Sequence, residues 1–210
     1  RRLCDLARSR GITTIVDGGH TFAQFPFTRD DLGCDFYGTS LHKWLTAPVG
    51  NGFLYAKRDR IREVWPLFAA PPEQDEDVRK FEQIGTYPIA LRNAVSEALT
   101  FHLAIGLERK AVRLRYLRDR WMTAVSGLPR VRLLTSPDPA QGCALGALRI
   151  DGIGAAALVD YLIKKHLIHV RARFVPGEWE GIRVTPNVFT TVEEIDRFSA
   201  AIRLAATKGI

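Results

Sequence analysis

Short apolar runs separated by polar loops dominate the first third of the chain. The β-branched run at residues 12–16 predicts a buried strand that ends at Asp17. Two further short strands are expected at residues 35–39 and 52–56, between loops rich in Gly, Pro, Ser and Thr. Strands that alternate with loops and helices indicate an α/β fold.

The pattern changes in the second part of the chain. A proline-rich and then acidic stretch at residues 68–83 predicts an exposed connection, and apolar residues at helical spacing between Pro88 and Pro129 predict one long helix or two. Thr191 with Glu194 three residues later is a capping-box pattern that announces a last helix. This part is typical of an α+β domain, with strands expected at residues 131–134, 143–150, 169–174 and 181–185 and a helix around residues 158–163.

Composition adds the broad class. The 210 residues are 46% hydrophobic and 25% charged, and no apolar run approaches the ~20 residues of a membrane-spanning helix. This excludes a disordered chain, and we expect no membrane partner. Cys4, Cys34 and Cys143 form no closely spaced pair, so we expect neither disulfides nor a metal site. A reducing, cytoplasmic location follows as the expectation, since no signal peptide is visible.

The net charge of +7 comes mainly from arginine, with a cluster between Arg109 and Arg120. Such a run is usually the solvated face of a helix and less often a nucleic-acid surface. We therefore expect no nucleic-acid partner, although a basic binding module stays open as an alternative.

Asp17 is the first candidate for chemistry, because it follows a strand and precedes Gly18, Gly19 and His20. Ligands of open α/β sheets bind beyond the carboxyl ends of the strands, where this carboxylate would emerge. Taken alone, the same residues also fit a simple Asp-Gly turn.

Lys43 is the second candidate, in a chain that contains few lysines. Its neighbours Trp44 and Leu45, and the small residues after them, predict a partly desolvated amine. A neutral amine is the form that attacks carbonyl groups. An isolated lysine could equally extend its amine to the surface.

The combination of Asp17-x-x-His20 with Ser40-x-His42-Lys43 resembles the class V aminotransferase family of fold type I pyridoxal-phosphate enzymes. The segment at residues 42–55 is most similar to the isopenicillin N epimerase branch.

The resemblance covers only the carboxyl-terminal part of the family's chain. It implies an α/β fold in which residues 1–75 are the remainder of the cofactor-binding large domain. Residues 76–110 would be a connection with an interdomain helix, and residues 111–210 a small α+β domain.

The resemblance also implies cofactor contacts. Lys43 would hold pyridoxal 5'-phosphate as an internal aldimine and move the substrate α-proton, and Asp17 would pair with the pyridine nitrogen. His20 would contact the phenolic oxygen of the cofactor, and Ser40 and His42 would lie near its phosphate.

Two more family positions lie further along the chain. Gly85 and Thr86 match a segment that reaches the phosphate of the neighbouring subunit, which implies a homodimer with shared sites; Thr86 could otherwise be a simple helix N-cap. Arg183 matches the arginine that binds the substrate α-carboxylate, a task that suits the planar guanidinium fork.

The expected function is therefore that of a pyridoxal-phosphate enzyme acting on the amino group or α-carbon of an amino acid or amine, by epimerisation or transamination. Elimination on the same cofactor and a non-catalytic basic fragment are the alternatives. Cysteine desulfurases of this class need a nucleophilic Cys shortly before the Arg183 position, and no Cys lies between His166 and Arg183. We therefore do not expect desulfurase chemistry of that type.

Overall fold

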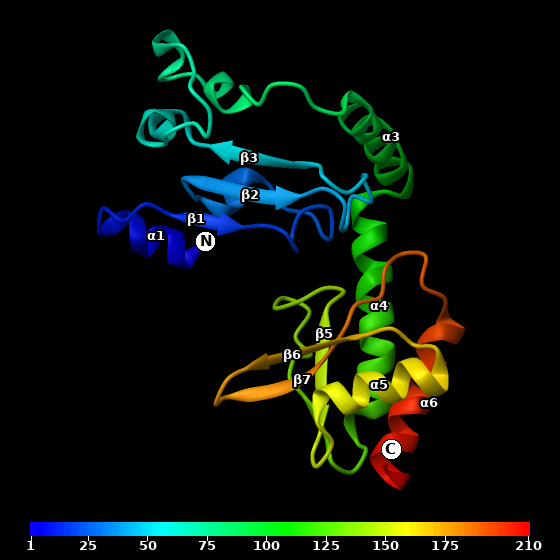
Figure 1. Ribbon diagram of the computed structural model, residues 1–210. Coiled ribbons are helices and arrows are strands. Elements are labelled where there is room, and N and C mark those ends of the chain that lie inside the picture. Colours follow the sequence, from blue (N-terminus) through cyan, green and yellow to red (C-terminus); the bar gives the residue numbers. More distant parts are fainter. The chain divides into compact units, whose positions relative to one another are not determined.

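The computed structural model describes residues 1–210 and divides into two compact units, Arg1–Leu107 and Glu108–Ile210 (Figure 1). The first unit contains a three-stranded sheet of order β1-β2-β3. Strand β1 (Ile15–Asp17) runs parallel to β2 (Phe36–Ser40), and β3 (Gly52–Ala56) runs antiparallel to β2. The helices of this unit are α1 (Arg2–Ser9), α2 (Arg29–Leu32) and α3 (Ile89–Ile105), with 3-10 turns at Arg58–Glu63, Pro72–Gln74 and Val78–Glu82.

The prediction of a buried first strand is wrong. Only Ile15–Asp17 pair with β2, and Ile12 and Ile15 are 57% and 76% exposed. The reason is that β1 is a three-residue strand whose Ile15 side chain lies on a face that no other part of the described chain covers. The connection at residues 68–83 is mainly exposed as expected, but Lys80 within it is buried and its Nζ donates to the Asp75 carbonyl at 2.9 Å.

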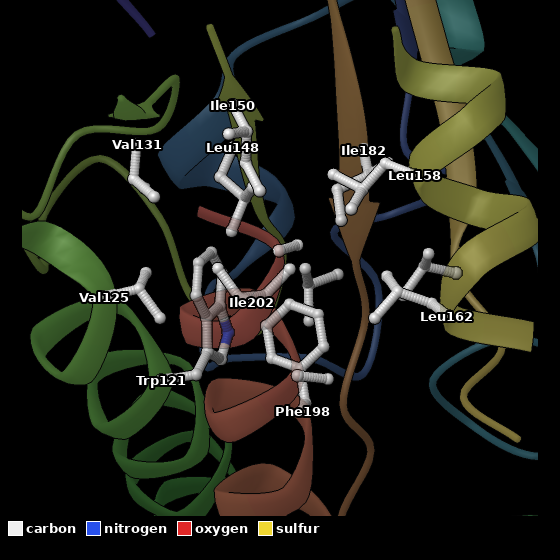
Figure 2. Close-up of a cluster of buried hydrophobic side chains, with 14 of the residues drawn as sticks. Trp121, Val125, Val131, Leu148, Ile150, Leu158, Leu162, Ile182, Phe198 and Ile202 are labelled. Atoms are coloured by element: carbon white, nitrogen blue, oxygen red, sulfur yellow. The ribbon is translucent and has the colours of Figure 1, made fainter. Parts of the chain in front are cut away.

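The second unit is a four-stranded antiparallel sheet of order β4-β5-β7-β6 with three helices. The hydrophobic side chains of one sheet face meet those of the helices in a continuous core (Figure 2). Trp121, Leu148 and Ile182 are fully buried in it. The elements are α4 (Leu107–Ser126), β4 (Val131–Leu133), β5 (Gly146–Ile150), α5 (Ala155–His166), β6 (Arg171–Val175), β7 (Trp179–Val184) and α6 (Val192–Lys208).

The structure decides two points about the helices, the number of helices after Pro88 and the capping box at Thr191. The apolar run after Pro88 forms two helices, because Gly106 between them has a φ of 84°, a conformation that ends α3. The capping box of the last helix is confirmed, since the Thr191 side chain accepts from the Glu194 amide and the Glu194 side chain accepts from the Thr191 amide.

The basic cluster on α4 is not the solvated helix face that its composition favours. Arg109 is exposed, but Lys110 and Arg118 are buried, and Arg118 pairs with Asp119 at 2.7 Å. Burial lowers the pKa of Lys110 to about 8. Part of this charge is therefore structural. None of the helices combines the length and apolarity that crossing a bilayer requires.

Candidate active site

The site begins where β1 ends. Asp17 is in register with Gly38 of β2, and the next amide, that of Gly18, donates to the Gly38 carbonyl at 2.7 Å. The Asp17 carboxylate turns back and its Oδ1 accepts from the Gly19 amide at 2.9 Å. The strand pairing and this turn together fix the position of the carboxylate at the carboxyl end of the sheet.

A buried tyrosine explains why glycine follows Asp17. A Cβ on Gly18 would lie 1.9 Å from the ring of Tyr37, so no larger residue fits there without displacing the ring. The Tyr37 hydroxyl also lies 2.9 Å from Thr21 Oγ1, and Thr39 Oγ1 donates to the Gly18 carbonyl at 3.0 Å. Two residues of β2 thus hold the turn that carries Asp17.

Lys43 lies in the loop that follows β2. The loop is closed by a hydrogen bond from the Leu41 amide to the Asn51 carbonyl at 3.0 Å and by one from Ala47 to Leu41 at 3.1 Å. The flanking side chains of Trp44 and Leu45 are buried, whereas Lys43 is only half-buried. The apolar neighbours therefore anchor the loop and leave the amine accessible.

The two principal candidates converge on one glycine. The point that a Cβ on Gly19 would occupy lies 3.0 Å from Lys43 Nζ and 3.1 Å from Asp17 Oδ1. An amine and a carboxylate thus border the same small space, which a side chain at residue 19 would fill.

The other candidates near Lys43, which are His20, Ser40 and His42, differ in their contacts and exposure. The His20 ring packs edge-on against Trp44 with centroids 6.3 Å apart, and Gln24 Nε2 donates to the His20 carbonyl at 2.6 Å. Ser40 ends β2 opposite Gly52, and His42 is exposed. The structure brings His20 to the Lys43 loop, while the phosphate roles of Ser40 and His42 stay predictions.

Gly85 and Thr86 lie on an exposed segment before α3. The alternative of Thr86 as a simple N-cap is wrong, because the N-cap residue is Pro88 and no side chain caps this helix. Gly85 has a φ of 69°, and a Cβ there would meet nothing within 4 Å. No hydrogen bond joins this pair to Lys43, so their role at a neighbouring subunit also stays a prediction.

Arg183 belongs to the second unit, in β7, and is half-buried. Its Nε is buried and has no hydrogen-bond partner. Burial lowers the pKa of the guanidinium, and the neighbouring Arg173 and Arg171 add to this effect. An anion bound at the guanidinium would compensate this charge.

The three cysteines carry no sign of nucleophilic chemistry. All are buried and none is in a disulfide. Cys143 is a core thiol, and burial raises the pKa of Cys143 and of Cys34. A raised pKa keeps a thiol protonated and therefore unreactive.

Comparison with known proteins gives the family. The family model described as aminotransferase class-V matches residues 1–198. The chain belongs to the class V aminotransferase family. It is 34% identical to the isopenicillin N epimerase of Streptomyces clavuligerus, over 95% of this chain and 54% of that protein. It is 30% identical to a probable cysteine desulfurase of Xylella fastidiosa, over 95% of this chain and 51% of that protein.

A solved structure confirms the fold class. The cysteine desulfurase of Thermococcus onnurineus superposes with a TM-score of 0.83 at 19% identity, over 99% of this chain and 56% of that one. The chain thus has the α/β fold of fold type I enzymes, and it spans about half the length of the curated relatives it matches.

Pyridoxal phosphate is the cofactor of this family. The residues that follow β1 and β2 fit it, because the Asp17 carboxylate and the Lys43 amine border one small space. The motifs made Asp17 and Lys43 identifiable in advance. Tyr37 contacts the turn after Asp17, and the Asn51 carbonyl closes the Lys43 loop; both were missed because each is separated in sequence from the group it supports.

Proposed function

We propose that the full-length protein is a pyridoxal-phosphate-dependent enzyme that acts on the amino group or α-carbon of an amino acid, by epimerisation or transamination. The observation that carries this is the approach of Lys43 Nζ and Asp17 Oδ1 to one point beside Gly19. Family membership supports the cofactor, and the 34% identity to an isopenicillin N epimerase supports chemistry at the α-carbon.

The proposed roles follow from the groups present. Bound pyridoxal phosphate supplies an electron sink for a carbanion at the substrate α-carbon. Lys43 would hold the cofactor through its Nζ and, once released by substrate, carry the α-proton on the same nitrogen. Asp17 would hold a proton on the pyridine nitrogen by a charge-assisted hydrogen bond. The hydrogen bond from Gly19 keeps that carboxylate in place.

The remaining site residues are assigned by their place in the fold. His20 would contact the cofactor ring from the Trp44 side, and Ser40 and His42 would donate to its phosphate. Gly85 and Thr86 would donate to the phosphate held by a second copy, so the active form is a homodimer. The exposed position and left-handed φ of Gly85 support an open backbone segment there.

Desulfurase chemistry is disfavoured although probable desulfurases are among the relatives. That chemistry needs an accessible thiol nucleophile, whereas the thiols of Cys4, Cys34 and Cys143 are all buried. Elimination on the same cofactor would use the same Lys43 and Asp17, and product analysis separates it from epimerisation and transamination.

Reductive labelling tests the proposal. The full-length protein is loaded with pyridoxal phosphate, reduced with borohydride and digested for peptide mass mapping. We expect the pyridoxyl mass on the peptide that contains Lys43, and no labelled peptide from Lys43→Ala. The matched control is Lys57→Ala, which removes an exposed lysine that pairs with Asp59 at 3.1 Å and should label normally. A label on any other lysine would refute the assignment.

The reaction type needs a second measurement on the same preparation. A panel of L-amino acids is incubated in heavy water, and the products are separated by chirality. Deuterium at the α-carbon of a D-product indicates epimerisation, and a 2-oxo acid formed in amounts limited by cofactor or by added oxo acid indicates transamination. A 2-oxo acid formed catalytically together with ammonia would indicate elimination instead.

A further inference from the structure

The sheet of the second unit has two unlike faces. One packs against the helices through Leu148 and Ile182 (Figure 2). Because side chains alternate along a strand, the residues between these buried ones point to the other face. That outward face is rich in arginine, with members on all four strands: Arg132, Arg149, Arg171, Arg173 and Arg183.

These five arginines form two groups with different surroundings. Arg132 and Arg149 are opposite each other on β4 and β5, and both pair with Asp151, at 2.9 and 3.3 Å. Their charge is therefore compensated within the unit.

The second group, which we name the arginine trio, consists of Arg171, Arg173 and Arg183. Arg171 and Arg183 are directly opposite each other in the antiparallel β6–β7 pair, and Arg173 is two residues further along β6 on the same face. None of the three forms an ion pair with a carboxylate. The nearby Glu180 on β7 accepts from the Ala155 amide at 3.2 Å, so its carboxylate is engaged elsewhere.

Like charges placed directly opposite each other in a sheet are destabilising. The strain is visible at Arg183, where burial and the two other arginines lower the pKa and where Nε is buried without a partner. A single α-carboxylate on Arg183 would neutralise one of three positive charges. Two charges would stay uncompensated beside it, on the exposed side chains of Arg171 and Arg173.

We propose that the arginine trio binds a substrate with two carboxylates, the α-carboxylate on Arg183 and a second, side-chain carboxylate on Arg171 and Arg173. This rests on the proposed function and deepens it, because it makes the substrate an acidic amino acid. Guanidinium groups suit the task since each binds a carboxylate through two parallel hydrogen bonds.

Binding of paired ligands to the full-length protein tests this. Glutarate carries two carboxylates, and its monoamide, glutaramate, has the same shape with one charge removed. By calorimetry we expect glutarate to bind about 10- to 100-fold more tightly, the usual effect of a charged hydrogen-bonded contact. The same preference should appear in KM for glutamate over glutamine with the holoenzyme.

Variants separate the trio from the rest of the face. The double variant Arg171→Gln/Arg173→Gln should lose the preference for glutarate while its affinity for glutaramate changes less than about threefold, the size of a surface effect. Arg183→Gln should weaken both ligands. Arg132→Gln is the control, because it removes an outward arginine that Asp151 already compensates, and it should keep the full preference. Because the two side chains are exposed and their charges repel Arg183, the double variant should unfold at the wild-type urea concentration or slightly above it.

Three results would overturn the proposal. The wild type could bind glutarate and glutaramate with equal affinity, or the preference for glutarate could survive in the double variant. The third result is a protein that binds single-stranded DNA through the trio in a salt-dependent way and does not bind glutarate. Failure of Lys43 labelling with an intact glutarate preference would instead reject the enzyme and keep the dicarboxylate site. Correct labelling without the preference would keep the enzyme and reject the acidic substrate.

Discussion

The two units of the chain differ in how far they bury their large apolar side chains. The second unit closes its own core, with Trp121, Leu148 and Ile182 fully buried between one sheet face and the helices. The first unit leaves large apolar side chains in solvent, and Trp65 and Leu67 are 91% and 90% exposed. The stable scaffold and the reactive groups are therefore separated along the sequence, since Asp17 and Lys43 both belong to the first unit.

The first unit holds its site in two ways, by hydrogen bonds at the turn after β1 and by buried apolar side chains in the loop after β2. Cys4, Cys34 and Tyr37 form one small apolar cluster of this unit, and Trp44 and Leu45 are buried elsewhere in it. Tyr37 contributes to both packing and hydrogen bonding, because its ring lies in this cluster while its hydroxyl contacts Thr21. Substitutions beside Asp17 should therefore disturb packing and hydrogen bonding together.

The largest predicted difference in stability is between the variants of two tryptophans, one in each unit. Trp121→Ala removes a fully buried ring from the second unit and should reduce its free energy of unfolding by about 3–5 kcal/mol. Trp65→Ala removes a ring that is 91% exposed and should change stability by no more than about 0.5 kcal/mol. Urea unfolding of each variant, followed by circular dichroism, checks both. Equal costs at the two positions would mean that Trp65 is covered in solution.

The sequence predicted side-chain burial better in α6 than in β1 for a physical reason. The helical spacing of Ile195, Phe198 and Ile202 predicts an inward helix face because these residues meet a core within the same unit, and all three are buried. The run at residues 12–16 has the composition of a buried strand, but burial depends on whether other elements cover its side chains, and Ile12 and Ile15 are exposed. Apolar pattern alone cannot report that.

The candidate site shows the same limit. Asp17 and Lys43 were identifiable because each belongs to a short motif, and the structure brings the two motifs together. The arginine trio was not identifiable as a group, because β6 and β7 must pair before Arg171 and Arg183 become neighbours. The burial of Arg118 was missed for a related reason, since composition does not show which face of α4 is covered.

The next prediction concerns chemistry in the first unit. Asp17→Ala should lower kcat by about 100-fold or more, the range found when one preorganised electrostatic contact is removed. Cofactor content, measured by absorbance after gel filtration, should fall much less because Lys43 still holds the cofactor. Arg183→Gln in the second unit should mainly raise KM. A variant of Asp17 that loses cofactor and activity in parallel would show that the carboxylate serves retention instead.

A glycine pair tests how tightly the first unit is packed around the site. Gly18→Ala places a Cβ 1.9 Å from the Tyr37 ring, and this overpacking should cost about 1–3 kcal/mol of stability. Gly38→Ala lies in the neighbouring strand, where a Cβ meets nothing within 4 Å, and should cost far less. Thermal unfolding of the two variants gives the comparison. A stable Gly18→Ala protein would show that the ring moves freely and that the turn is not fixed by packing.

The smallest predicted changes are losses of stability on acidification. Their cause differs between the two units. In the first unit Asp35 accepts from the Thr14 amide at 2.9 Å, and this hydrogen bond lowers the pKa of Asp35. In the second unit a two-pronged contact from Arg120 lowers the pKa of Asp196. Each carboxylate therefore contributes stability above its ordinary pKa of 3.8 and loses it as the pH falls through the lower folded pKa.

Asp35→Asn and Arg120→Ala separate these two contributions. Each variant should be slightly less stable than the wild type at pH 7, and each difference should shrink as the pH falls below about 3.8, because the wild-type carboxylates then become protonated. High salt should reduce the Arg120→Ala difference, since that pair is exposed, and should leave the Asp35→Asn difference nearly unchanged, because a short hydrogen bond to the backbone is screened little. Urea midpoints at pH 7 and pH 3, each at low and high salt, measure this. If the stability difference between Asp35→Asn and the wild type depended on salt, the ion pair of Asp35 with Arg60, at 3.5 Å, would outweigh its hydrogen bonds with Thr14. The first unit would then depend on surface charge and not on the junction between β1 and β2.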